Sequence, residues 1–97
     1  MRVLIVDDHP IVISGCRALL ESDPTVEVLE ASDGEAAYSA YFALMPEVAL
    51  IDLKLPSLSG LELVRRILQR EPQAKIIIFS MYDPSSTLGA GWHRISG

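Results

Sequence analysis

One stretch constrains the fold of this chain more than any other. In Val48–Asp52, four apolar residues lead to a single carboxylate. An apolar run of this length is typical of a strand that is buried on both faces of a parallel sheet. Asp52 then stands at the carboxyl end of the strand, where open α/β sheets bind their ligands. The stretch therefore predicts an α/β fold in which Asp52 is a candidate nucleophile.

Three other segments have the character of strands. Residues 2–6 and 74–80 are apolar and rich in β-branched side chains, and residues 26–31 alternate apolar with acidic ones, as a strand nearer the edge of a sheet does. Apolar residues at helical spacing separate the strands. The predicted buried faces of these three helices are Val12, Cys16, Leu19 and Leu20; Ala37, Ala40, Tyr41 and Leu44; and Leu61, Val64, Ile67 and Leu68. The alternation predicts a doubly wound parallel sheet with helices on both faces.

Composition restricts the possible functions. A net charge of −5 argues against a nucleic-acid-binding surface, which would be basic. No apolar run approaches the roughly 20 residues of a membrane-spanning helix, and the acids at Asp7 and Asp8 come too early for a signal peptide. Cys16 is the single cysteine, so an internal disulfide is impossible. We expect a cytoplasmic domain that binds neither nucleic acid nor membrane.

Four polar residues are predicted to meet at one edge of the sheet. Asp7 and Asp8 follow the first strand, Asp52 ends the third and Ser80 ends the fourth. Clustered carboxylates raise one another's pKa unless a cation lies among them, and hard oxygen ligands suit Mg²⁺. A metal beside a carboxylate is an arrangement for phosphoryl transfer. We therefore predict a magnesium site at which Ser80 donates a hydrogen bond to a phosphoryl oxygen.

The motifs together resemble one known family. The chain contains D-D-H-P from Asp7, then V-A-L-I-D followed by L-x-L-P-x-x-S-G, and finally I-I-I-F-S ending at Ser80. In this order and spacing they are similar to the receiver domain of bacterial two-component response regulators, above all to the subfamily that precedes a LuxR/NarL-type DNA-binding domain. The resemblance runs from Met1 to about Asp83. It implies a flavodoxin-like (CheY-like) fold.

The resemblance also implies a role for individual residues. Asp52 would accept a phosphoryl group from a sensor histidine kinase. The domain would then be a phosphoprotein in a relay that regulates transcription, and not an enzyme beyond its own autophosphorylation and autodephosphorylation. Mg²⁺ would be bound by Asp7 or Asp8, by Asp52 and by the backbone carbonyl of Lys54. Ser80 would be the switch hydroxyl.

The chain departs from the family after about Asp83. Receivers continue with a helix, a fifth strand that carries a lysine, and a last helix, whereas residues 84–97 are rich in Gly and Ser and contain no lysine. We therefore expect an incomplete receiver domain at 1–83, truncated or altered, and an irregular tail at 84–97. Without a fifth strand, Ile76–Phe79 would be an exposed apolar edge. That edge predicts homo-oligomers, formed through it or through exchanged tails.

Two alternatives remain open. One is a signalling-incompetent fragment that only self-associates. The other is a haloacid-dehalogenase-like phosphohydrolase, which also places an aspartate at the end of a strand. That class has a second acid two residues further on, where this chain has Lys54.

His9 follows the acid pair Asp7 and Asp8, and it is expected to be a surface or capping residue and not a metal ligand.

Overall fold

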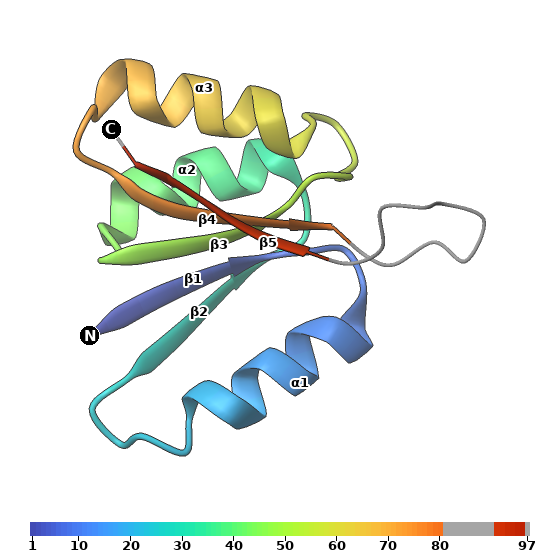
Figure 1. The fold of residues 1–97 in the computed structure, drawn as a ribbon, viewed down its shortest axis with the longest axis vertical. Helices are drawn as coiled ribbons and strands as arrows, with labels where there is room; N and C mark the ends of the chain where they lie inside the picture. The colour runs from blue at the N-terminus through green and yellow to red at the C-terminus, as the bar shows by residue number, and fades with distance from the viewer. Residues whose placement is uncertain (81–90, 97) are drawn as a thin grey trace.

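The computed structural model describes residues 1–80 and 91–96, with residues 80 and 91–96 described by their backbone alone. Within these ranges, helices pack on both faces of a five-stranded sheet (Figure 1). The strands are β1 (Arg2–Val6), β2 (Glu27–Ala31), β3 (Val48–Asp52), β4 (Lys75–Ser80) and β5 (Gly91–Ser96). The helices are α1 (Pro10–Leu20), α2 (Gly34–Leu44) and α3 (Gly60–Arg70).

The strand order determines where a ligand can bind. The order is β2-β1-β3-β4-β5, and β1 to β4 are mutually parallel. From β1 the chain passes to β2 on one side and later returns to β3 on the other, so the topology switches between β1 and β3. Such a switch opens a crevice at the carboxyl ends of the two strands. The predicted doubly wound, flavodoxin-like sheet is confirmed.

Apolar side chains form a core on each face of the sheet. The larger core lies under α2 and α3 and the smaller one under α1 (Figure 1). Three predicted core positions are wrong, because Leu19 is 78% exposed, Leu61 is 60% exposed and Leu44 is 38% exposed. The buried face of α3 instead contains Leu63, Val64 and Ile67. Helical spacing alone does not say whether Leu61 or Leu63 faces the sheet, because each lies at helical spacing from other apolar residues; the position of the sheet decides it.

The predicted irregular tail is corrected by β5. Residues 91–96 form a strand that pairs antiparallel with β4, with Ser80 opposite Gly91 and Lys75 opposite Ser96. The local sequence has no strand periodicity, but the free edge of β4 offers backbone partners, and unpaired edge groups favour strand addition. Residues 81–90 lie outside the described part of the chain.

No helix among the described residues is long and apolar enough to cross a membrane.

The same strand corrects the prediction of an exposed apolar edge. β4 lies between β3 and β5, and Ile76, Ile78 and Phe79 are at most 4% exposed. Self-association through the edge of β4 therefore loses its basis. Exchange of tails stays an untested prediction.

Gly15 offers a test of local stability in α1. It lies inside the helix, and a Cβ built on it would meet no atom within 4 Å. Glycine within a helix costs about 0.5–1 kcal/mol relative to alanine, because its unfolded backbone is more flexible. We expect Gly15→Ala to raise the free energy of unfolding by about that amount, measured by urea denaturation. No change, or a loss of stability, would show that α1 does not form as described.

Candidate functional site

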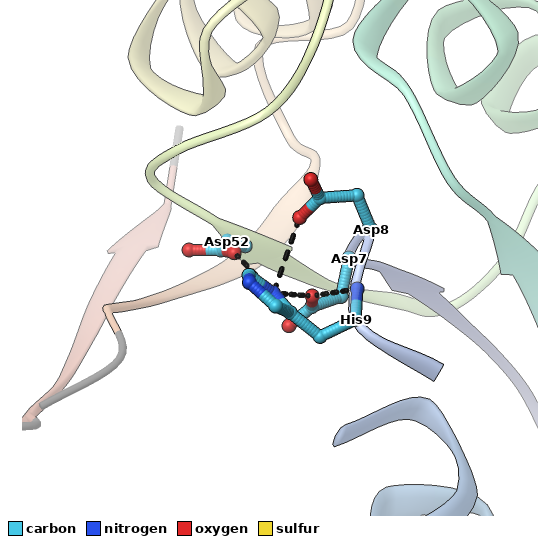
Figure 2. Close-up of side chains that lie close together, drawn as sticks. All are labelled: Asp7, Asp8, His9 and Asp52. Carbon is cyan, nitrogen blue, oxygen red and sulfur yellow. Dashed lines mark hydrogen bonds and ion pairs between the residues drawn. The ribbon is translucent and has the colours of Figure 1, made fainter. Parts of the chain in front are cut away.

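The parallel register of β1 and β3 brings two aspartates together. Val6 pairs with Ile51, so the residues that follow them, Asp7 and Asp52, lie side by side at the carboxyl edge of the sheet (Figure 2). Both are almost completely buried, with exposed fractions of 0% for Asp7 and 1% for Asp52. The side chain of Asp8 is partly exposed. The predicted convergence of the three carboxylates is therefore present.

His9 is the residue of this site that the sequence did not reveal. Its Nδ1 atom lies 2.7 Å from Asp7 Oδ1, 3.1 Å from Asp8 Oδ1 and 3.8 Å from Asp52 Oδ2 (Figure 2). His9 does occupy the N-cap position of α1, but its side chain makes no capping hydrogen bond. The available signal was D-D-H-P itself. Pro10 begins the helix, which leaves His9 in an extended conformation beside the acids.

Electrostatics favour the charged form of His9. The hydrogen bond to Asp7 raises the pKa of the imidazole more than desolvation lowers it, and the charges of Asp7, Asp8 and Asp52 raise it further. The backbone N–H of His9 also donates to Asp7 Oδ1 at 2.7 Å. In the described part of the chain, His9 is thus the basic group paired with Asp52.

The two buried carboxylates have unused acceptor atoms. Within the described residues, Asp7 Oδ2 and Asp52 Oδ2 are buried and accept no hydrogen bond. Asp52 Oδ1 accepts one from the backbone N–H of Lys54 at 3.2 Å. Burial raises the pKa of Asp52, and the hydrogen bond from Lys54 only partly offsets this effect. A buried carboxylate oxygen that accepts no hydrogen bond is costly, so a cation is the group that would stabilise this arrangement.

The donor set fits a small divalent cation. One ligand atom from each of Asp7, Asp8, His9 and Asp52 lies within 4.8 Å of the other three. Carboxylate oxygens are the ligands that Mg²⁺ prefers, and Mg²⁺ keeps several waters when one or two carboxylates hold it. The partly exposed Asp8 lies on the solvent side of the cluster and leaves room for such waters. The predicted Mg²⁺ site is therefore chemically reasonable.

The loop after Asp52 is fixed by close backbone packing. The N–H of Leu53 donates to Phe79 O, and the N–H of Gly60 donates to Leu53 O, both at 2.9 Å. A Cβ on Gly60 would lie 2.1 Å from the carbonyl oxygen of Asp52, so only glycine fits here without displacing the strand end. The first turn of α3 thus determines where Asp52 lies.

The same loop is attached to the start of α2. The N–H of Gly34 donates to Pro56 O at 3.2 Å, and a Cβ on Gly34 would lie 2.3 Å from Leu58 O. The side chain of Leu58 is buried in the larger core. The loop beside Asp52 and the start of α2 are therefore in direct contact.

Two other predicted site residues are placed only in part. Asp52 pairs with Phe79 across β3 and β4, so the backbone of Ser80 lies one residue beyond, at the same edge of the sheet. The hydroxyl of Ser80 lies outside the described atoms, and its switch role stays a prediction. Lys54 is exposed and contacts Asp52 through its backbone N–H. The role of its carbonyl as a metal ligand also stays a prediction.

Comparison with known proteins gives a consistent family. The sequence model of the response regulator receiver domain matches residues 3–93. The chain is 41% identical over 90 residues to the nitrate/nitrite response regulator protein NarP of Escherichia coli (strain K12), a match covering 92% of this chain and 42% of that protein. It is 32% identical over 87 residues to the transcriptional regulatory protein DegU of Brevibacillus brevis, covering 89% of this chain and 37% of DegU.

Solved structures agree with these matches. A two-component response regulator of the LuxR family from Aurantimonas sp. SI85-9A1 has a TM-score of 0.77 and 42% identity, over 84% of this chain and 59% of that one. RcsB from Salmonella enterica serovar Typhimurium, bound to promoter rprA in the presence of phosphomimetic BeF3⁻, has a TM-score of 0.76 and 34% identity, over 86% and 43% of the two chains. The chain spans 37% and 42% of the lengths of DegU and NarP.

Proposed function

The chain belongs to the response regulator receiver domain family, and on that premise we propose that Asp52 accepts a phosphoryl group from a sensor histidine kinase with Mg²⁺ bound beside it. One observation supports the proposal above the others. Asp7 and Asp52 are buried side by side, and each has an oxygen without a hydrogen-bond partner among the described residues. A structural core does not need such a pair, whereas a site for a cation and a phosphoryl group does.

The proposed reaction is a single displacement at phosphorus. A carboxylate oxygen of Asp52 forms a bond to phosphorus while the bond from phosphorus to the donor breaks, and the bonding electron pair leaves with the donor. The product is an acyl phosphate on Asp52. Bound Mg²⁺ would supply neutralisation of the negative charge that the carboxylates and the phosphoryl group bring together. Asp7, Asp8, Asp52 and the carbonyl of Lys54 would hold it.

The protein's own residues prepare Asp52 for this role. The hydrogen bond from Lys54 N–H to Oδ1 fixes the orientation of the carboxylate. Oδ2, which accepts no hydrogen bond from the described residues, faces His9 at 3.8 Å. In the proposal, Ser80 donates to a phosphoryl oxygen and so detects phosphorylation from β4. The connection between the loop and α2 offers a second route by which the change could spread.

The biological output is proposed from the relatives. DegU is named a transcriptional regulatory protein, and the RcsB structure contains promoter DNA and a phosphate mimic. We therefore propose that phosphorylation of Asp52 regulates transcription in the cytoplasm, through a DNA-binding domain outside residues 1–97. Within this scheme the domain is a regulatory phosphoacceptor. The alternatives, a signalling-incompetent fragment or a haloacid-dehalogenase-like phosphohydrolase, have no support from the comparisons.

Phosphorylation can be tested with a small phosphodonor. We expect wild-type protein incubated with acetyl phosphate and Mg²⁺ to gain the mass of one phosphoryl group and to lose it on treatment with hydroxylamine, which cleaves acyl phosphates. Asp52→Asn should gain nothing, because an amide is a poor nucleophile. Asp23→Asn is the matched control, since Asp23 is exposed and bonded locally to Thr25. No gain in the wild type, or an undiminished gain in Asp52→Asn, would overturn the proposal.

A further inference from the structure

We propose that His9 is a metal ligand, and that its imidazole gives the cluster of Asp7, Asp8, His9 and Asp52 a preference for Co²⁺, Ni²⁺ or Zn²⁺ over Mg²⁺. The proposal concerns the metal site of the proposed function and rests on that site, but it does not require phosphorylation. It starts from the position of Nδ1, which lies among the three carboxylates (Figure 2).

The distances around Nδ1 fit metal coordination. Ligands bound at about 2.1 Å in an octahedral site are about 3.0 Å apart when adjacent and about 4.2 Å apart when opposite. Nδ1 lies 2.7 Å from Asp7 Oδ1, 3.1 Å from Asp8 Oδ1 and 3.8 Å from Asp52 Oδ2. All three separations are near the adjacent spacing or between the two values. His9 therefore needs only small adjustments to share a cation with the carboxylates.

A second observation indicates a ligand at this place. Asp7 Oδ2 and Asp52 Oδ2 are buried and have no hydrogen-bond partner in the described part of the chain. The side chains that carry them are 0% and 2% exposed. Hydrogen bonds inside the cluster use Asp7 Oδ1 and leave these two oxygens unsatisfied. A cation would provide what the protein does not, and Asp52 Oδ2 lies 3.8 Å from His9 Nδ1.

The chemistry of the imidazole determines which cation gains. Mg²⁺ prefers oxygen ligands and water, so a nearby nitrogen adds little to its binding. Co²⁺, Ni²⁺ and Zn²⁺ bind imidazole well, and histidine is the commonest protein ligand for metals of this kind. The side chain of His9 is 52% exposed, so the ring has space to turn from its hydrogen bond with Asp7 toward a metal. In this proposal the affinity for Co²⁺, Ni²⁺ and Zn²⁺ depends on His9, whereas the affinity for Mg²⁺ does not.

Paired titrations of two metals test the assignment. The affinities of the intact 97-residue protein for Ni²⁺ and Mg²⁺ are measured by isothermal titration calorimetry for wild type, His9→Asn and His93→Asn. We expect His9→Asn to lower the Ni²⁺ affinity at least about tenfold, as loss of groups that only support a metal ligand already does. Its Mg²⁺ affinity should not fall. His93→Asn, which changes the other histidine of the chain, should leave both affinities unchanged.

The variant is designed to fold. His9 is the N-cap of α1 and makes no side-chain capping bond, and asparagine is a preferred N-cap residue. A second measurement uses wild-type protein, so this test of the proposal does not depend on whether the variant folds. In nitrogen-15 NMR spectra, Zn²⁺ should shift the ring nitrogens of His9, with the largest change at Nδ1. Absence of that shift would overturn the proposal, as would a fall in Ni²⁺ affinity that His93→Asn reproduces or that Mg²⁺ shares equally.

The two experiments distinguish failure of the metal assignment of His9 from failure of the phosphoacceptor role of Asp52. If acetyl phosphate fails to modify Asp52 but His9→Asn still weakens Ni²⁺ selectively, the metal assignment stands and the phosphoacceptor role fails. If Asp52 is phosphorylated with Mg²⁺ and the Ni²⁺ affinity of His9→Asn equals that of wild type, the assignment of His9 fails alone.

Discussion

Asp52→Asn is expected to raise the free energy of unfolding of the metal-free protein at pH 7. The carboxylate of Asp52 is buried, lies beside Asp7, and has one oxygen without a hydrogen bond from the described residues. Leaving a buried polar group unsatisfied costs about 1–3 kcal/mol, and more when the group is charged. Asparagine keeps the shape and removes the charge. We therefore expect a gain of about 1–3 kcal/mol, measured by urea denaturation in the presence of a chelator.

The sign of the pKa shift predicts how this gain depends on pH. Burial raises the pKa of Asp52 in the folded protein above its value in the unfolded chain. The unfolded chain therefore gives up this proton at lower pH, and the wild type loses stability as the pH rises through the folded pKa. The advantage of Asp52→Asn should be largest at neutral pH and should disappear once the pH falls below the unfolded pKa.

Addition of Mg²⁺ should reverse the order of stability, so that wild type becomes more stable than Asp52→Asn. A ligand that binds only the folded state stabilises it by about 2.7 kcal/mol at a hundred times its dissociation constant. Wild type should gain this stability, and Asp52→Asn should gain much less because a ligand is lost. The control is Asp23→Asn, since hydrogen bonds from Thr25 lower the pKa of Asp23 and removing this charge brings no gain. Equal free energies of unfolding for wild type and Asp52→Asn without metal would show that burial of the Asp52 carboxylate does not destabilise the protein.

Gly60→Ala is expected to be strongly destabilising. The added Cβ would lie 2.1 Å from the carbonyl oxygen of Asp52 and 2.8 Å from the Cα of Leu53. Both atoms belong to the backbone, so relief requires movement of α3 or of the end of β3. Overpacking of a tightly packed site costs about 1–3 kcal/mol, occasionally more, and we expect the upper part of that range. The midpoint of urea denaturation measures it.

The same change at Gly15 provides a matched control for Gly60. Both residues lie in helices and both gain one methyl group, but Gly15 has open space around it. The two variants should therefore move the denaturation midpoint in opposite directions. Gly60→Ala should also slow phosphorylation by acetyl phosphate, because Asp52 is displaced, whereas Gly15→Ala should not. A Gly60→Ala protein as stable and as reactive as the wild type would show that the approach of α3 to Asp52 is looser than described.

Much of the fold could be predicted from local sequence. Apolar runs of strand length and the segments of helical spacing between them were sufficient for the four parallel strands and the three helices. The side chain at the end of each strand is also local information, and parallel strands place their carboxyl ends together. For that reason Asp7, Asp8 and Asp52 could be assigned to one edge before any coordinates were known. The orientation of Leu61 and Leu63 could not, because each of these leucines lies at helical spacing from other apolar residues of the segment.

The sequence by itself thus determined the doubly wound sheet and the meeting of three carboxylates, since both follow from strand ends. Only the tertiary structure decided two other features. Residues 91–96 become β5 because the edge of β4 is free for pairing, which the local sequence of 91–96 does not show. His9 enters the acidic cluster because Asp52, 43 positions away in the printed sequence, arrives beside Asp7 through the pairing of β1 with β3. The contact of His9 with Asp52 depends on the packing of the whole sheet, and the D-D-H-P motif alone does not record it.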